Sequence, residues 1–346
     1  MSTWFPETNR SWLERIVIKI LSHGPMPKHV AFIMDGNRRY ATKLNEEKSL
    51  GHSKGFDKLA EVLSWCRDFN ITEATLFTFS IENFKRPKEE IDYLMNLFRR
   101  QAQKVLEEFS QIENHQICFR IYGKIDLLPD DVQKSLAKLV LETDRFDKFY
   151  LNICFAYTSR EEITTAINDL RDCVQNQIIE SSDINYNTLS NAMYSLGRDD
   201  PDILIRTSGE IRLSDFLLWQ TSFTSIFFCD ALWPEISIWN LFSAILRYQY
   251  CYESLKRSRQ EYFKILEAND LEFCKKIFDE KQSRQKRLNG DAEYRRELES
   301  FETFLEERNL RIEKCRQYIK RKRFEALLKI NANSSENGEV RLKKNS

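Results

Sequence analysis

The chain has 346 residues, of which 53 are Lys or Arg and 53 are Asp or Glu, so its formal net charge is zero although 31% of the residues are charged. This balance excludes a polyanion-coating protein as the first interpretation. With 42% hydrophobic residues and only 9 Gly and 7 Pro, the composition is typical of a folded chain with a large core, not of a disordered or collagen-like one.

The first predicted element is an amphipathic helix over residues 9–22, which places Trp12, Ile16 and Ile20 on one face. The Gly-Pro-Met-Pro segment at 24–27 ends this helix. The stretch lacks the uninterrupted apolar core of a signal peptide, and no stretch of the chain reaches the roughly 18 apolar residues of a membrane span. We therefore expect any membrane contact to be peripheral. The helix could serve as a core helix, a lid over a product channel or an interfacial anchor.

Strands and helices then alternate along the chain. Apolar runs of strand length lie at 30–34, 75–79, 117–122, 149–156, 203–205 and 226–229. Helical spacing of apolar residues predicts helices at 52–69, 87–110, 130–143 and 160–178. Because the strand runs are apolar on both faces and alternate with helices, we predict an α/β fold with a single central, mostly parallel six-stranded sheet flanked by helices.

From residue 253 onward the strand runs vanish, and helical spacing continues in a highly charged segment. We expect a C-terminal helical appendage here, in the form of a hairpin that turns near Asn289 and Gly290. A polar, disordered end follows it. The predicted division is an N-terminal helix, a main α/β domain, a helical extension and a disordered tail, at residues 1–27, 28–252, 253–330 and 331–346.

Charge is distributed unevenly over these parts. Residues 28–252 carry 26 Lys and Arg against 33 Asp and Glu, whereas residues 253–346 carry 24 against 18. The densest basic run of the tail could be a solvated helix face, or it could meet anionic lipid headgroups or nucleic acid. Base-stacking aromatic residues are not interleaved with it, so we expect no nucleic-acid partner. The run consists of the basic residues 314, 316, 320, 321, 322 and 323.

The eight cysteines are scattered singly, without a C-x-x-C pair and without a histidine cluster near them. This pattern argues against a zinc site and against a disulfide framework. It favours free thiols in a reducing compartment.

The candidate functional residues follow the predicted strands, because ligands of parallel α/β sheets bind outside the carboxyl ends of the strands. After the first strand, Asp35 can hold a metal ion, and the turn at Gly36 can present backbone N–H groups to a phosphate. Arg38 and Arg39 would add charge-assisted hydrogen bonds. The alternative is an ordinary Asp-Gly turn with solvated arginines. His52, at the start of the next helix, could reach the same phosphate or be structural.

Two further strand ends carry similar groups. After the second strand, Asn83 and Arg86 supply donors just before Pro87, which favours the start of a helix. After the fifth strand, Arg206 and Arg212 flank a glycine, and Ser214 follows. Paired arginine forks suit a diphosphate, because guanidinium groups match phosphate oxygens bidentately.

Arginines that converge on one crevice repel each other unless an anion lies there. The three strand ends therefore predict a site for one or two diphosphates with Mg²⁺, and Asp35 is the carboxylate among these motifs that is placed as its ligand. Neither a Walker A loop nor a G-x-G-x-x-G loop is present, so a nucleotide site is disfavoured.

The sequence resembles the cis-prenyltransferase family, and within that family it resembles the eukaryotic catalytic subunits. Four blocks match the family's motifs in order, and the resemblance covers residues 25 to 250. The blocks are 29–39 (HVAFIMDGNRR), 79–83 (FSIEN), 206–220 (RTSGEIRLSDFLLWQ) and 232–235 (LWPE).

The resemblance implies a ditrans,polycis-polyprenyl diphosphate synthase. Such an enzyme condenses isopentenyl diphosphate units onto farnesyl diphosphate to give long-chain dehydrodolichyl diphosphate, the precursor of dolichol for protein glycosylation. In this family Asp35 would bind Mg²⁺ on farnesyl diphosphate, and Asp35, Asn37 and Asn83 would form the catalytic set. The substrate diphosphates would be held by Gly36, Asn37, Arg38, Arg39 and His52 on the allylic side and by Arg206, Arg212 and Ser214 on the isopentenyl side, with Asn83 and Arg86 between the two groups.

The family also implies an apolar tunnel for the growing chain. Candidates are Leu76, Phe77, Phe79, Leu94, Met95 and Phe98, each of which could equally be ordinary core. The resemblance further implies a peripheral location on the cytosolic face of the endoplasmic reticulum membrane.

Two departures from the family pattern concern the site. Ser225 stands where homodimeric bacterial members have a second metal-associated Glu, and Lys48 stands where an Arg is usual. Eukaryotic catalytic subunits share the loss of the Glu and depend on an accessory subunit of the Nogo-B receptor type, so the resemblance implies a heteromer. The alternative function is a non-catalytic scaffold subunit of the same complex, in which the Asp-Gly-Asn and arginine blocks would be degraded; here they are intact.

Overall fold

A computed structural model of the chain describes residues 4, 9–293 and 300–342, with the backbone alone for residues 285–293 and 333–342. Its contacts divide into two compact units. The first comprises Met1–Glu161, Asp199–Leu255 and Ala326–Ser346, and the second comprises Glu162–Arg198 and Lys256–Glu325.

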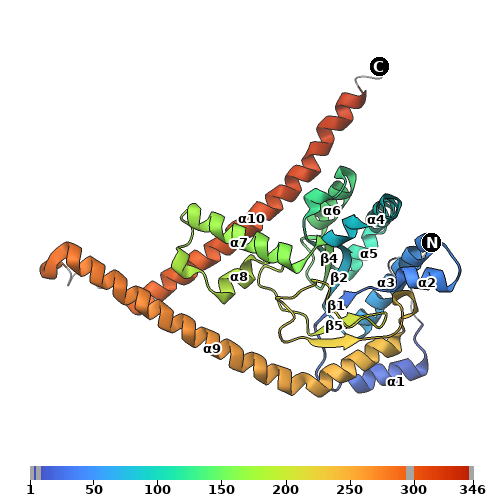
Figure 1. Cartoon of the computed structure of the whole chain (residues 1–346), viewed down its shortest axis with the longest axis horizontal. Helices are drawn as coiled ribbons and strands as arrows, with labels where there is room; N and C mark the ends of the chain where they lie inside the picture. Colours follow the sequence, from blue (N-terminus) through green and yellow to red (C-terminus); the bar gives the residue numbers. More distant parts are fainter. Residues whose placement is uncertain (1–3, 5–8, 294–299, 343–346) are drawn as a thin grey trace. The chain divides into compact units, whose positions relative to one another are not determined.

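The first unit is built around a six-stranded sheet (Figure 1). Its strands are β1 (His29–Ile33), β2 (Glu73–Ser80), β3 (Ile117–Tyr122), β4 (Phe149–Tyr157), β5 (Ile203–Arg206) and β6 (Ser225–Phe228). The strand order is β3-β4-β2-β1-β5-β6, and every neighbouring pair is parallel. The predicted single, mostly parallel six-stranded sheet is confirmed, and the sheet is parallel throughout.

Each predicted helix is present, most with shifted ends. The helices of the described chain are α1 (Trp12–Leu21), α2 (Asn37–Lys43), α3 (Lys48–Asp68), α4 (Lys88–Glu107), α5 (Phe109–His115), α6 (Asp130–Thr143), α7 (Ser159–Gln175), α8 (Tyr186–Ala192), α9 (Ile238–Glu293) and α10 (Phe301–Leu342). Three short ones, α2, α5 and α8, were not predicted as separate elements. Short 3₁₀ turns are η1 (Ile81–Lys85), η2 (Ile125–Leu127), η3 (Ser181–Asp183) and η4 (Trp233–Glu235).

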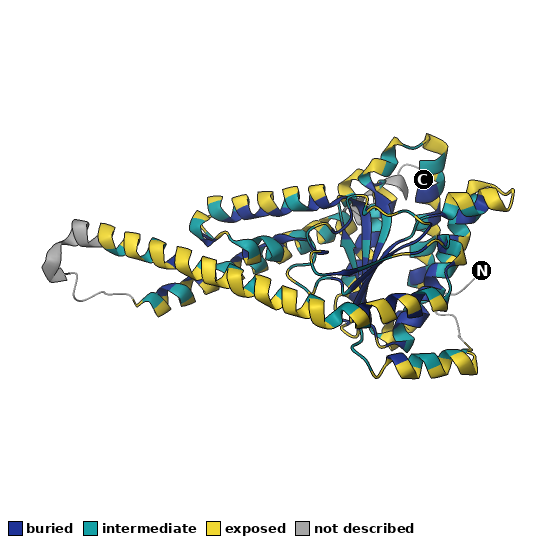
Figure 2. Ribbon diagram, turned by 60° about the horizontal axis from the view of Figure 1, so that its bottom comes forward, coloured by how far each residue is buried: buried dark blue, intermediate teal, exposed yellow. Residues whose placement is uncertain are grey.

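Local capping explains one of these differences. Helix α1 begins at Trp12, not at residue 9, because the Ser11 side chain accepts a hydrogen bond from the Glu14 backbone N–H while the Glu14 side chain caps Ser11. The outer face of α1 is exposed, and Leu21 is its buried residue (Figure 2).

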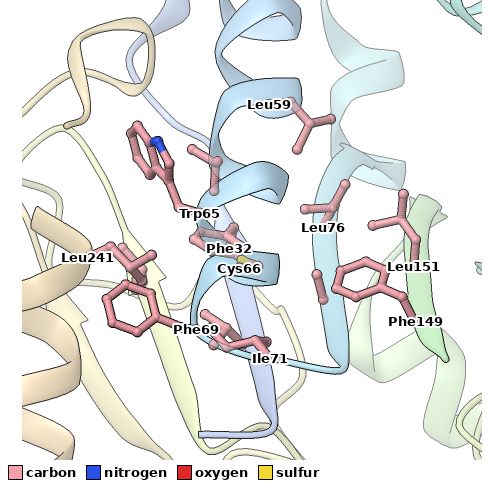
Figure 3. Packing of buried hydrophobic residues seen from close by; sticks show 14 of the residues in the cluster. Phe32, Leu59, Trp65, Cys66, Phe69, Ile71, Leu76, Phe149, Leu151 and Leu241 are labelled. Atoms are coloured by element: carbon pink, nitrogen blue, oxygen red, sulfur yellow. The ribbon is translucent and has the colours of Figure 1, made fainter. Parts of the chain in front are cut away.

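The main hydrophobic core lies between the sheet and helix α3. Figure 3 shows Phe32 of β1 and Leu76 of β2 among side chains of α3 such as Trp65, with Leu241 of α9 beside them. Phe69 packs edge-on against Phe242 of α9, with 5.5 Å between ring centroids. Burial of these large side chains fixes α3 on the sheet, and α3 is the helix that carries His52.

The second unit is held by buried ion pairs. Asp183, which is 1% exposed, accepts two hydrogen bonds from Arg311 of α10 at 2.8 and 2.9 Å. Arg308 of α10 donates at 2.8 and 2.9 Å to Asp270 of α9. These pairs join residues 162–198 to the long helices, although the sequence places that segment in the 28–252 domain.

The basic run of α10 is partly neutralised inside the same unit. Lys322 Nζ lies 2.8 Å from carboxylate oxygens of both Asp169 and Asp172 on α7. Arg323 also donates to Asp169, at 2.9 Å. At these two positions the basic side chains make ion pairs within the protein. We had predicted a solvated helix face, or contact with lipid headgroups or nucleic acid.

Two details of the C-terminal helices differ from the prediction. The turn predicted near Asn289 and Gly290 is wrong, because α9 continues to Glu293 and the connection falls in residues 294–299, outside the described part. A single glycine without a proline is tolerated inside a helix. Helix α10 runs to Leu342, so its backbone includes most of the segment 331–346 for which we predicted disorder.

We predict that Asp183→Asn destabilises the second unit. The amide keeps the shape of the carboxylate but leaves the guanidinium group of Arg311 without its buried counter-charge and Arg308 with Asp270 alone, which costs about 3–5 kcal/mol. Urea unfolding followed by circular dichroism measures the loss. The matched control is Asp172→Asn, at a more exposed ion pair, with a much smaller expected effect. Equal losses in the two variants would contradict the assignment.

Candidate active site

A cavity of about 990 Å³ lies at the carboxyl ends of β1, β2 and β5. These strands are neighbours, with β1 in the middle, so the segments that follow them meet at one place. The structure brings all the predicted site residues together in the lining of this cavity. They are Asp35, Gly36, Asn37, Arg38, Arg39, His52, Asn83, Arg86, Arg206, Arg212 and Ser214.

Asp35 and Arg206 form the ion pair at the centre of the site. The strand register pairs Ile33 with Arg206, which sets the guanidinium beside the residues that follow β1. Arg206 Nη2 donates to Asp35 Oδ2 at 2.8 Å, and the Arg206 side chain is only 3% exposed. Its Nη1 donates to the Arg212 carbonyl oxygen at 2.5 Å and to Ser214 Oγ at 2.7 Å. One buried guanidinium therefore holds the Asp35 carboxylate and the Arg212–Ser214 loop together.

The backbone of Asp35 is also held from two sides. The Thr207 hydroxyl accepts from the Asp35 N–H at 3.0 Å and donates to the Asp35 carbonyl oxygen at 2.7 Å. The Trp233 N–H donates to the same carbonyl oxygen at 3.0 Å, and its indole N–H donates to the Gly55 carbonyl oxygen at 2.7 Å. Thr207 and Trp233 lie in the motif blocks, but no sequence pattern predicted a role for either of them.

Two glycines allow the close packing around this loop. Gly36 has φ +107°, in the left-handed region, and a Cβ there would lie 3.1 Å from the Leu232 Cα. A Cβ at Gly51 of α3 would lie 2.0 Å from the Asn37 carbonyl oxygen. The Asn37 amide donates to the Met34 carbonyl oxygen at 3.2 Å, which closes the turn between β1 and α2.

Arg39 and Asn83 also have protein partners. Arg39 Nη1 donates to the Ser208 carbonyl oxygen at 2.9 Å and so links the first and third motifs. Its Nη2 lies 3.7 Å from Glu210 Oε1. The Asn83 side-chain oxygen accepts from the Ser80 N–H at 3.0 Å and thereby caps η1.

A second group of charges surrounds His52. Arg86 Nη1 donates to Glu90 Oε1 at 2.9 Å, and the same oxygen lies 3.9 Å from Arg38 Nη1 and 4.0 Å from His52 Nε2. Burial, and then the positive charges of Arg86 and Arg38, lower the pKa of His52 to about 4, although the Glu90 carboxylate opposes them. We did not predict Glu90; its position four residues after Arg86 was the available signal.

Arg160 is a further residue that the sequence analysis missed. It follows the end of β4, lines the cavity, and its Nε donates to Asp215 Oδ2 at 2.7 Å. Ligands of parallel sheets bind outside the carboxyl ends of the strands, and this argument, which identified the other motifs, applies to Arg160 after β4 as well. Lys48, noted as a departure from the family pattern, also lines the cavity.

The inner part of the cavity is apolar. Of the predicted tunnel residues, Phe77, Phe79, Leu94 and Phe98 line it. Leu76 and Phe98 line a second, apolar cavity of about 40 Å³, so Phe98 borders both spaces. Met95 is 3% exposed and belongs to the core cluster around Phe79 and Leu94.

The donor set of the cavity fits a magnesium ion carried by a phosphate ligand. Within residues 4, 9–293 and 300–342, no three His, Cys, Asp or Glu side chains gather as a ready-made metal site. The Asp35 carboxylate is 36% exposed and lines the cavity. Mg²⁺ characteristically uses one or two carboxylates together with substrate phosphates and water. Asp35 alone can therefore supply the protein's share of such a site.

Comparison with known proteins gives consistent matches. The family model described as "Putative undecaprenyl diphosphate synthase" matches residues 33–289. The dehydrodolichyl diphosphate synthase complex subunit DHDDS of Homo sapiens is 45% identical over 295 residues, which cover 85% of this chain and 89% of that protein. The tritrans,polycis-undecaprenyl-diphosphate synthase (geranylgeranyl-diphosphate specific) of Methanocaldococcus jannaschii is 39% identical over 238 residues, or 68% of this chain and 85% of that protein.

A solved structure has the same fold. It is lavandulyl diphosphate synthase from Lavandula x intermedia in complex with dimethylallyl diphosphate, with a TM-score of 0.61 and 29% sequence identity. The match covers 65% of this chain and 95% of that one.

We predict that His52 makes the stability of the free protein depend on pH. An unfolded histidine has a pKa near 6.5, above the value of about 4 in the folded chain. The folded state therefore binds fewer protons, and stability falls as the pH drops through this window. Between pH 7.5 and pH 5 the loss is about 2 kcal/mol by linkage. Urea unfolding of the chain and of His52→Gln at both pH values isolates this contribution. A variant that loses as much stability as the parent would contradict it.

Proposed function

Because the chain belongs to the cis-prenyltransferase family, we propose that it condenses isopentenyl diphosphate units onto farnesyl diphosphate. The product is a long-chain dehydrodolichyl diphosphate, the precursor of dolichol for protein glycosylation. The observation that carries this proposal is the meeting of three arginine-bearing strand ends and Asp35 in one cavity with an apolar interior.

Farnesyl diphosphate is assigned to the side of the cavity formed by the first two strand ends. Its diphosphate would contact the Gly36–Asn37 turn and the exposed guanidinium groups of Arg38 and Arg39, together with His52. Asp35 would be the protein ligand of Mg²⁺. A bound Mg²⁺ would supply charge neutralisation for the departing diphosphate.

Isopentenyl diphosphate is assigned to the loop after β5. Arg212 is 64% exposed and Ser214 lines the cavity, so both can reach a ligand, while the buried Arg206 holds the loop in place. Asn83 and Arg86 lie between the two assigned subsites.

The reaction follows from this arrangement. The C1–O bond of farnesyl diphosphate breaks and its electron pair leaves with the diphosphate, whose growing charge the arginines stabilise. The isopentenyl double bond donates its electrons to form the new C–C bond at C1. Loss of a proton then gives the cis double bond, and a diphosphate oxygen is the proposed proton acceptor. Holding the two reactants next to each other supplies much of the rate.

The growing chain would extend into the apolar interior. Phe77, Phe79 and Leu94 line the cavity, and Phe98 lines both the cavity and the second apolar space. This burial removes the lengthening hydrocarbon from water. Leu76, Phe77, Phe79, Leu94, Met95 and Phe98 remain our predicted channel residues.

The alternative of a non-catalytic scaffold subunit is disfavoured by the same lining, because every predicted site residue of the intact motifs lines the cavity. An accessory subunit of the Nogo-B receptor type is nevertheless part of the proposal. The human relative is described as a subunit of a complex. The segment after β5 exposes Ile211, Leu218 and Phe228, and β6 is an edge strand, which are features of a surface that meets another protein.

We further propose a peripheral position on the cytosolic face of the endoplasmic reticulum membrane, with α1 as the interfacial anchor. Trp12 is 73% exposed and Ile20 64% exposed, and Leu13 and Ile16 lie on the same helix, with Lys19 among them. Among the described helices, none combines the length and apolar character that a membrane span requires.

The proposed reaction is tested with the purified chain, with and without the accessory subunit, by adding farnesyl diphosphate, labelled isopentenyl diphosphate and Mg²⁺. We expect butanol-extractable long-chain product, and we expect Asp35→Ala to abolish it while the fold, seen by circular dichroism, is retained. Asp126→Ala, at an exposed carboxylate outside the cavity lining, is the control with unchanged turnover. Absence of product even with the accessory subunit would reject the reaction, and full turnover of Asp35→Ala would reject the metal assignment.

The membrane position is tested by co-sedimentation with vesicles of phosphatidylcholine and phosphatidylserine. Trp12→Glu should weaken binding by about tenfold or more, because it replaces an exposed aromatic side chain with a charge on the proposed anchoring face. Leu127→Glu, at an exposed leucine of η2, should bind like the parent chain. Equal binding of all three proteins would exclude α1 as the anchor.

A further inference from the structure

The proposed roles leave one feature of the cavity unexplained, which is the buried imidazole of His52. Its side chain is 12% exposed, and within the described part of the chain its buried Nε2 has no hydrogen-bond partner. The Tyr93 ring lies nearby, with 6.4 Å between the ring centroids, and its hydroxyl donates to the Ser49 carbonyl oxygen at 2.8 Å. A buried polar atom without a partner costs free energy unless a ligand pairs with it.

The charges around His52 come from three elements. Arg38 belongs to α2, Arg86 ends η1, and Glu90 lies in the first turn of α4. Lys48, on the same helix as His52, lines the same cavity. The cations outnumber the single carboxylate, so the ligand-free surroundings oppose a positive charge on the imidazole.

A bound diphosphate reverses this balance. The ligand brings several negative charges close to the His52 ring, and these charges neutralise the neighbouring cations. The ligand oxygens also accept hydrogen bonds. A protonated imidazole donates from both nitrogens, whereas a neutral one donates from a single nitrogen. The ligand therefore favours the protonated form of the same ring that the empty cavity keeps neutral.

We propose that His52 takes up one proton from solvent when a diphosphate binds in this cavity, and that the Glu90 carboxylate is the positioning residue that supports the protonated ring. The inference rests on the proposed assignment of the allylic diphosphate to this side of the cavity. The proton forms an N–H bond at His52, no bond of the ligand breaks, and the proton returns to solvent when the diphosphate leaves.

Glu90 fits this role by its position. It is only 9% exposed, it accepts from Arg86 at 2.9 Å, and its carboxylate lies 4.0 Å from His52 Nε2. A carboxylate beside an anion site weakens anion binding by repulsion, so the presence of Glu90 next to these cavity residues calls for a compensating function. Stabilising one additional positive charge beside the ligand is such a function.

The test is titration calorimetry with farnesyl diphosphate and Mg²⁺ at pH 7, on whichever preparation turns over in the assay above. Measurement in two buffers of different ionisation enthalpy gives the number of protons taken up. The phosphate of the ligand itself titrates near pH ~6, so the uptake of His52→Gln is subtracted as the baseline. We expect up to one additional proton for the parent chain and less for Glu90→Gln. Glu89→Gln is the matched control, because Glu89 lies in the same first turn of α4 but is exposed, and it should behave like the parent.

The pH dependence of affinity is the second measurement. Between the pKa of the free imidazole, about 4, and the higher pKa of the bound imidazole, affinity for farnesyl diphosphate should fall with rising pH by up to about tenfold per pH unit for the parent chain relative to His52→Gln, and the difference in slope should vanish at higher pH. His52→Asn replaces His52→Gln if the latter does not fold. Equal proton uptake by the parent and His52→Gln would overturn the inference, and parent-like uptake by Glu90→Gln would overturn the role of Glu90. If Arg86→Gln does not weaken binding, the assignment of the diphosphate itself fails; the two failures are therefore distinguishable.

Discussion

The pairing of β1 with β5 is the constraint on which the rest of the site depends. The register that sets Ile33 beside Arg206 brings a buried guanidinium to Asp35, and that guanidinium also holds the Arg212 carbonyl and the Ser214 hydroxyl. A slip of one residue would turn every side chain of β5 to the opposite face of the sheet. Both proposed diphosphate subsites would then lose their shared support.

The arginines of the protein divide by exposure into two kinds. Arg206 and Arg308 are 3% and 5% exposed, and their Nη groups donate to oxygen atoms of the protein. Arg38, Arg39 and Arg212 are half-exposed or more and line the cavity. A buried guanidinium cannot leave its partners without a large cost, whereas an exposed one can exchange water for phosphate. Buried arginines hold the structure, and exposed ones are suited to bind anions.

Sequence patterns predicted the sheet and most of the cavity because both follow from local order. The strand runs are apolar on both faces, and the polar groups of Asp35, Arg86 and Arg206 come directly after them, so the parallel arrangement brings them together. Other features depend on partners far apart in the chain. Asp183 pairs with Arg311 across 128 residues, and Lys322 pairs with Asp169 across 153, so neither the grouping of 162–198 with the long helices nor the neutralised basic run has a local signal. The role of Glu90 similarly depends on three surrounding elements.

The central position of β1 has a consequence for how the protein is made. Asp35 and Arg206 are separated by 171 residues, so β1 leaves the ribosome long before its partner β5 exists. At synthesis rates of about 5–20 residues per second the delay is roughly ten to thirty seconds. During that time an apolar strand that is completely buried in the finished sheet has one unpaired edge, which invites aggregation. The nascent chain therefore has a long interval in which a chaperone would be of use, and the cavity cannot form before β5 has been made.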